Sequence, residues 1–160
     1  MSRHRIPRFT LSVLALVGAA SAAFGQDVTA PVAGTVADGA GADADYQSSL
    51  TTISANWSGF SDPESGIASY AWALGTTSGG TDVQALTNVG AATTATQAAL
   101  GLAHGATYYV TVQATNGNSL TITATSDGIR VDATPPVVTT TTLAGGSTGT
   151  VYRQALAATD

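Results

Sequence analysis

Apolar and polar side chains alternate most strictly between residues 108 and 115 of this 160-residue chain. One face carries Tyr108, Val110, Val112 and Ala114, and the other carries Tyr109, Thr111, Gln113 and Thr115. Because successive side chains of a strand point to opposite faces, this period of two predicts an antiparallel strand with one buried face. A turn containing Gly105 comes just before it, and Leu102 begins that turn.

Shorter runs of the same kind fill most of the chain, and turn residues separate them. The segment 62–66 (Asp-Pro-Glu-Ser-Gly) is one such turn, since aspartate opens β-turns, proline follows well and glycine closes them. No stretch has the spacing of an amphipathic helix. We expect seven strands, with an interruption in the last at Asp127–Gly128, over residues 32–37, 50–57, 67–74, 81–88, 93–100, 108–115 and 121–131. This spacing predicts an all-β fold, an antiparallel sandwich of two sheets.

The large apolar side chains of these runs define the expected core. Trp57 shares a strand face with Ile53 and Ala55, and Trp72 shares one with Tyr70 and Leu74. Aromatic residues make up only 6% of the chain, so these few side chains should dominate the buried area. The expected core residues are Trp57, Tyr70, Trp72, Leu102, Tyr108, Val110 and Val112.

Residues 1–25 have the pattern of an export signal. Three arginines precede an apolar run over residues 11–20, and the small residues that follow suit cleavage after Gly25 or after Ala22. An uncleaved membrane anchor is the alternative, but it needs about 20 apolar residues. We therefore expect a secreted or cell-surface protein without membrane insertion once the signal is removed.

Charge and cysteine content narrow the class of partner. Without residues 1–25 the chain keeps two arginines and no lysine against ten carboxylates, a formal net charge of −8. So acidic a surface repels phosphate, which argues against nucleic acid and anionic lipid as partners. The chain has no cysteine, so an exported form has no disulfide framework and must be stable through its core.

Two short segments match at a fixed offset of 105 residues. Asp27-Val-Thr-Ala-Pro31 recurs as Asp132-Ala-Thr-Pro-Pro136. Proline removes a backbone donor and stiffens the chain, which suits a junction between modules. We therefore expect residues 26–134 to form one module and residues 135–160 to hold a linker and the truncated start of a second.

Residues 27–134 resemble a fibronectin type III domain, of the variety found in tandem arrays of bacterial surface and secreted proteins. Residues 53–57 are similar to the second strand of that family with its core tryptophan, and residues 66–70 to the third with its inward tyrosine. Leu102, Gly105 and Tyr108 match the tyrosine corner of the immunoglobulin-like fold, although His104 stands where the family often has proline. The resemblance implies that the Tyr108 hydroxyl bonds to backbone near Leu102. Residues 137–156 resemble the start of a bacterial immunoglobulin-like repeat.

Acidic residues are the main candidates for a bound ion. Asp38, Asp43 and Asp45 lie together in the sequence, and Asp62 and Glu64 share the next loop. Calcium takes six to eight oxygen ligands, often from loop carboxylates. Loops at one end of a sandwich converge, so we expect a structural calcium site either where these groups meet or at a module junction with Asp132. The alternative is that they are ordinary turn and surface residues.

The sequence gives no catalytic set. His104 is the only histidine after residue 25, and its place in a turn suggests a solvated loop residue. With one histidine and no cysteine, we expect no zinc site, no cofactor and no enzyme activity. A glycosidase pair among the acids would need a groove with one carboxyl in a dry environment, and loop acids give no reason to expect one.

We therefore expect a non-enzymatic extracellular or cell-surface module that acts as a spacer or as an adhesion or interaction domain of a tandem-repeat protein. The alternative is a carbohydrate-binding or accessory module of a secreted hydrolase whose catalytic domain lies beyond residue 160. Phe60, Tyr46 and Tyr109 are the expected exposed aromatics for a polysaccharide or protein surface. The sequence does not determine the partner, the oligomeric state or the number of repeats.

Overall fold

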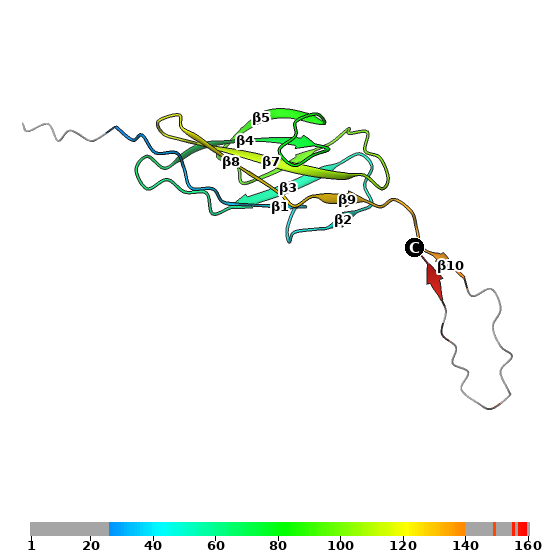
Figure 1. Ribbon diagram of the computed structural model, residues 1–160. Coiled ribbons are helices and arrows are strands. Elements are labelled where there is room, and N and C mark those ends of the chain that lie inside the picture. The colour runs from blue at the N-terminus through cyan, green and yellow to red at the C-terminus, as the bar shows by residue number, and fades with distance from the viewer. Residues whose placement is uncertain (1–25, 140–148, 150–154, 156, 160) are drawn as a thin grey trace, which may run out of the picture.

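The computed structural model describes residues 26–139, 149, 155 and 157–159, and every regular element in this part of the chain is a strand. Residues 26–131 form two packed layers of strands (Figure 1), as the sequence predicts, and every strand pair in them is antiparallel except β2 with β9. The smaller sheet contains, in spatial order, β1 (Thr35–Asp38), β3 (Ile53–Ser58) and β6 (Thr94–Gln97). The larger sheet contains β2 (Tyr46–Gln47), β9 (Ile129–Val131), β7 (Thr107–Asn116), β4 (Ile67–Gly75) and β5 (Gln84–Gly90), with β8 (Thr121–Thr125) also on β7.

The last expected strand is two strands in the structure. β8 pairs with residues 111–115 of β7, whereas β9 pairs with residues 107 and 108, so the two lie end to end along one side of β7. The interruption at Asp127–Gly128 that the turn residues predicted is therefore present. β2 was not expected. It is two residues long and is the parallel partner of β9.

The core lies between the two sheets. Six of the seven expected core residues are buried: Trp57, Trp72, Leu102, Tyr108, Val110 and Val112. Tyr70 is half-buried, and its ring meets Trp57 across the sheets at a centroid distance of 5.8 Å.

Phe60 was expected to be exposed, and that expectation is wrong. Only 8% of Phe60 is accessible, and its ring meets Tyr70 edge to face at 5.6 Å. Gly59 explains the error, because its φ of +78° breaks the alternation that ends at Trp57 and turns the next side chain inward. Gly34 leaves room for the ring, since a Cβ there would lie 2.6 Å from Phe60 Cδ2.

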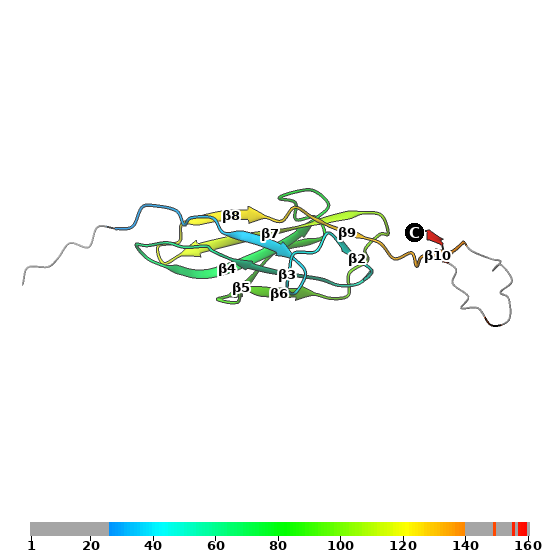
Figure 2. The ribbon, with the colours of Figure 1, turned by 90° about the horizontal axis from the view of Figure 1, so that it is seen from below.

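The chain enters and leaves the sandwich at opposite ends of its long axis (Figures 1 and 2). Beyond the exit, β10 (Val137–Val138) pairs with β11 (Ala158–Thr159). The expected signal at residues 1–25 lies outside the described residues, as does most of the expected second module. No helix of the described residues is long and apolar enough to cross a bilayer.

Candidate functional site: three polar clusters

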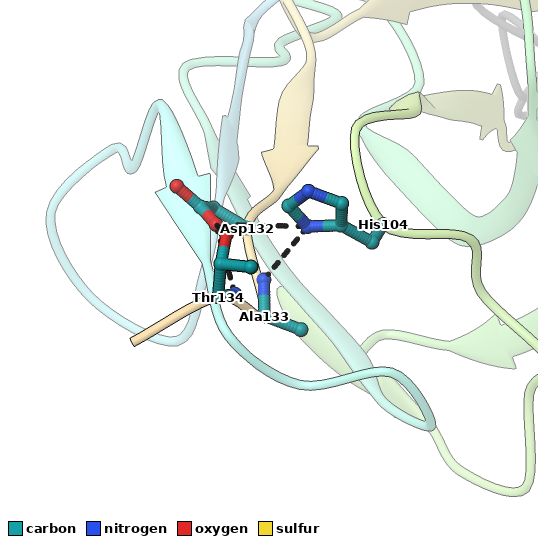
Figure 3. A network of polar contacts seen from close by, with 4 residues as sticks. All are labelled: His104, Asp132, Ala133 and Thr134. Atoms are coloured by element: carbon teal, nitrogen blue, oxygen red, sulfur yellow. Dashed lines mark hydrogen bonds and ion pairs between the residues drawn. The ribbon is translucent and has the colours of Figure 1, made fainter. Parts of the chain in front are cut away.

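Polar side chains gather at three places on the sandwich. The entry cluster lies where the chain enters and consists of Asp27, Thr29, Asp62, Glu64, Ser65 and Asn116. The edge cluster consists of Asp38, Asp43 and Asp127. The exit cluster lies where the chain leaves and consists of His104, Asp132 and Thr134 with the backbone N–H of Ala133 (Figure 3).

The exit cluster is built on the tyrosine corner. The hydroxyl of Tyr108 accepts a hydrogen bond from the Ala103 backbone N–H at 2.9 Å, the contact that the resemblance implied near Leu102. In addition, the Gly105 N–H donates to the Val131 carbonyl at 2.7 Å. The corner is therefore fixed both to β7 and to the end of β9, immediately before the exit segment.

His104 projects from this corner onto the exit segment (Figure 3). Its Nδ1 accepts the Ala133 N–H at 3.1 Å and lies 3.6 Å from Asp132 Oδ1, while 52% of the side chain stays exposed. Asp132 Oδ1 also accepts the backbone N–H of Thr134 at 3.1 Å and its hydroxyl at 2.7 Å. These two bonds, followed by the nearby His104 and Arg130, hold the pKa of Asp132 below its usual value.

The entry cluster repeats this local geometry and adds more donors. Asp27 Oδ1 accepts the Thr29 N–H at 2.9 Å and the Thr29 hydroxyl at 3.0 Å. Asp27 Oδ2 accepts from the Ser65 hydroxyl at 2.5 Å and from Asn116 Nδ2 at 2.8 Å. The Ser65 bond is the largest reason that the pKa of Asp27 is lowered.

Asp62 completes the entry cluster through the same amide. Asn116 Nδ2 also donates to Asp62 Oδ2 at 2.9 Å and to the Thr29 carbonyl at 3.1 Å, so two N–H bonds serve three acceptors. Asp62 Oδ1 accepts the N–H groups of Glu64 and Ser65, as expected for an aspartate that opens a turn. Together these donors, with Asn116 first, hold the pKa of Asp62 below its usual value.

Asn116 therefore joins three segments that are far apart in the sequence. It is the last residue of β7 and only 1% exposed, and its Oδ1 accepts the N–H groups of Asn118 and Leu120 in the turn to β8. The sequence analysis missed it. The sequence did contain a signal for it. Asn116 falls on the same strand face as the buried apolar series that begins at Tyr108, and a polar residue on that face must be buried.

The edge cluster has few donors. Asp38 ends β1 with no exposed surface; its Oδ2 accepts the Gly128 N–H at 3.0 Å, and its Oδ1 has no hydrogen-bond partner in the described part of the chain. Burial is the main reason that the pKa of Asp38 is raised to about 6; hydrogen bonds from the Ser126 side chain and the Gly128 N–H oppose the rise, and the negative charges of Asp43 and Asp127 add to it. One carboxylate oxygen of each residue lies within 4.8 Å of the others.

The acids thus gather differently from the expectation. Asp43 does lie beside Asp38, but Asp127, which the sequence analysis did not include, replaces Asp45 in this cluster. Asp62 and Glu64 join Asp27 at the entry, and Asp132 lies apart from both groups at the exit. The acids therefore do not all meet at one point, and the calcium site stays a prediction.

The aromatic side chains do not form one exposed face. Tyr46 is 63% exposed, Tyr109 is half-buried and Phe60 lies in the core. No pocket is found among the residues that the structure describes. Comparison with models of protein families and with curated proteins gives no match for this chain.

Proposed function

We propose that residues 26–134 are a non-enzymatic, extracytoplasmic sandwich of the fibronectin type III kind that serves as a spacer or adhesion module in a tandem-repeat protein. The observation that carries this proposal is the recurrence of one local structure at both ends of the module. Asp27 and Asp132, 105 residues apart, each accept the N–H and the hydroxyl of the threonine two residues later.

The surroundings of the two segments favour a head-to-tail arrangement. At the entry, Pro31 is buried and Asp27 is bonded by Ser65 and Asn116 of the module that follows it. At the exit, Pro136, Val137 and Val138 are exposed, the two valines by 63% and 59%. An exit segment of this kind suits the entry position of a further module, and the two ends point away from each other (Figure 1).

The strand order supports the family resemblance behind this proposal. A three-strand sheet, β1-β3-β6, packs on a sheet in which β7 lies between β4 and the β8–β9 pair. The resemblance implies about seven strands in two packed antiparallel sheets. The tyrosine corner at Tyr108 adds a second point of agreement.

A chain that contains two copies of the module, joined so that the 105-residue repeat is kept, tests the proposal. Residues 1–131 are followed directly by a second copy that starts at residue 27, so one Asp-x-Thr segment joins the copies. We expect small-angle scattering to give a rod with a maximum dimension roughly twice that of one module. A matched control replaces residues 27–31 of the second copy by a flexible Gly/Ser linker of equal length and should give a broader distance distribution.

The proposal fails if both chains give the same flexible or compact profile. Sedimentation with insoluble polysaccharide separates the carbohydrate-binding alternative, because a pure spacer stays in the supernatant.

A further inference from the structure

Asn116 is followed directly by Gly117, and an Asn-Gly pair carries a specific chemical reactivity. After loss of its proton to hydroxide, the glycine backbone nitrogen attacks the side-chain carbonyl carbon Cγ. The new N–Cγ bond closes a five-membered succinimide, and the side-chain nitrogen takes a proton from water and leaves as ammonia. Water then opens the ring to aspartate or to isoaspartate. Glycine favours this route because it has no Cβ to hinder the approach and has the most flexible backbone.

The packing of the entry requires glycine at this position. A Cβ on Gly117 would lie 2.9 Å from the Ser65 carbonyl oxygen and 3.1 Å from Ser65 Cβ. The Gly117 N–H donates to the Gly66 carbonyl at 3.2 Å. The turn after β7 and the turn over residues 62–66 therefore come together only because the reactive pair is present.

The fold also restrains the atoms that would have to react. Asn116 is buried, and its Nδ2, the leaving nitrogen, is bonded to two carboxylates and one carbonyl, while its Oδ1 accepts two backbone N–H groups. Ring closure must bring Cγ to bonding distance of the Gly117 nitrogen, which pulls both ends of the amide away from these partners. The bond from the Gly117 N–H to Gly66 must break as well, since this N–H has to lose its proton.

Deamidation would replace a donor by an acceptor where the entry cluster needs a donor. The bonds of Asn116 Nδ2 to Asp27 Oδ2 at 2.8 Å and to Asp62 Oδ2 at 2.9 Å form a latch between the entry segment and the sandwich. A carboxylate at position 116 would stand against these two carboxylates, and like charges so close repel. Isoaspartate would in addition lengthen the backbone by one carbon atom and shift Gly117 against Ser65.

We propose that Asn116–Gly117 is a site of spontaneous deamidation that the closed latch protects and that makes opening of the entry irreversible. Local opening of a folded protein occurs with its own free energy, so the latch sets how often the pair becomes reactive. Chemical conversion of the open form then removes it from the equilibrium, because the product does not reclose. This inference is independent of the proposed spacer role.

Peptide mapping of the full chain by mass spectrometry tests the proposal, after incubation at mildly alkaline pH in native buffer and in concentrated urea. Conversion adds the mass difference between an amide NH₂ and a hydroxyl group. We expect Asn116 to convert at least about tenfold more slowly in native buffer than in urea, because the folded chain must open first. Asn118 is exposed in the same turn and should show a smaller difference between the two conditions.

A matched pair of variants locates the protection. Asp27→Ala removes one acceptor of Asn116 Nδ2 from a segment outside the two sheets, so the sandwich should still fold. Conversion of Asn116 in native buffer should become about three- to tenfold faster, the effect of one hydrogen bond on an opening equilibrium. Asp132→Ala removes the corresponding aspartate at the other end of the module and should leave this rate unchanged.

The product itself can be mimicked by substitution. Asn116→Asp should lower the urea midpoint of unfolding at neutral pH, and by more than Asn118→Asp does, because only the first places a carboxylate against Asp27 and Asp62.

Three results would overturn the proposal. The first is an equal rate of Asn116 conversion in native buffer and in urea, which would mean that the latch protects nothing. The second is an equal native rate in Asp27→Ala and Asp132→Ala, and the third is an unchanged urea midpoint in Asn116→Asp.

Discussion

The entry cluster and the edge cluster each bring three carboxylates within 4.8 Å, yet their oxygens have different surroundings. At the entry, Asp27 and Asp62 together receive hydrogen bonds from Thr29, Ser65, Asn116 and the backbone of the turn. At the edge, Asp38 is more deeply buried and keeps one oxygen without a donor.

This difference teaches that proximity of acids does not define a cation site. Hydrogen bonds to the charged form lower the pKa of Asp27 and Asp62, so the protein itself stabilises those anions. Burial outweighs the hydrogen bonds from Ser126 and Gly128 and raises the pKa of Asp38, so the protein stabilises that anion less well. The balance between burial and hydrogen-bond donors, rather than the number of carboxylates, decides how well each cluster holds its charge.

The largest expected effect comes from a truncation in the hydrophobic core that supports both clusters. Trp57→Ala should lower the free energy of unfolding by about 3–5 kcal/mol, because truncation of a buried tryptophan leaves a large cavity. Urea denaturation followed by circular dichroism measures this loss. A loss of only a few tenths of a kcal/mol would show that the two sheets are not packed through this side chain.

Removal of the shared donor at the entry should have the next largest effect. Asn116→Ala leaves Asp27 Oδ2 and Asp62 Oδ2 close together without the amide between them, and it should cost about 2–3 kcal/mol. Denaturant unfolding at neutral pH measures it. Asn118→Ala is the control, since this exposed amide donates only to the Asp27 carbonyl and should cost less than about 1 kcal/mol. An equal loss of unfolding free energy in the two variants would mean that the Asn116 amide does not stabilise the entry cluster more than an exposed amide does.

The edge cluster should respond with the opposite sign. Without divalent cations, Asp38→Asn should raise the free energy of unfolding by about 1 kcal/mol, because it removes a buried charge and keeps an oxygen for the Gly128 N–H. The same measurement in chelator tests this. A loss of stability in chelator would mean that the carboxylate has a stabilising partner, and the contrast with the entry cluster would disappear.

Acid titration gives a finer and smaller test. Asp62 has a folded pKa below 3.8, so its stabilising contribution is present above pH 3.8 and is lost as the pH falls through the folded value. The difference in stability between the unsubstituted chain and Asp62→Asn should therefore be largest at neutral pH and should close as the pH falls through the folded pKa of Asp62. Asp82 and Asp132 are not coupled to Asp62 and remain in both chains, so subtraction removes their contributions, whereas Asp27 is charge-coupled to Asp62 and contributes to the difference. A difference that stays constant with pH would contradict the ionised latch.

The sequence predicted those features that depend on local alternation. The strand from Tyr108, the break at Asp127–Gly128 and most of the core follow from a period of two and from turn residues. Phe60 was wrongly predicted to be exposed because Gly59 interrupts the alternation of inward and outward side chains. The presence of a glycine does not by itself show to which side the next side chain turns. Asp38 and Asn116 are polar residues at strand positions where the alternation calls for a buried apolar side chain. This signal was available in the sequence for both the edge cluster and the entry cluster. The closeness of the Asp38 and Asp127 carboxylates could not be predicted from the local sequence, because it depends on how the two sheets pack together.

The positions of the two chain ends have a consequence for mechanical load. Tension applied through the entry and exit segments of the chain acts from opposite ends of the sandwich and therefore runs roughly along its strands (Figure 2). Hydrogen bonds of an antiparallel ladder lie across the strands, so this pull shears the ladder of β1 on β3 as a group instead of opening it one bond at a time. We expect force spectroscopy to record a higher rupture force through these ends than through attachment at the two ends of the β4–β5 hairpin.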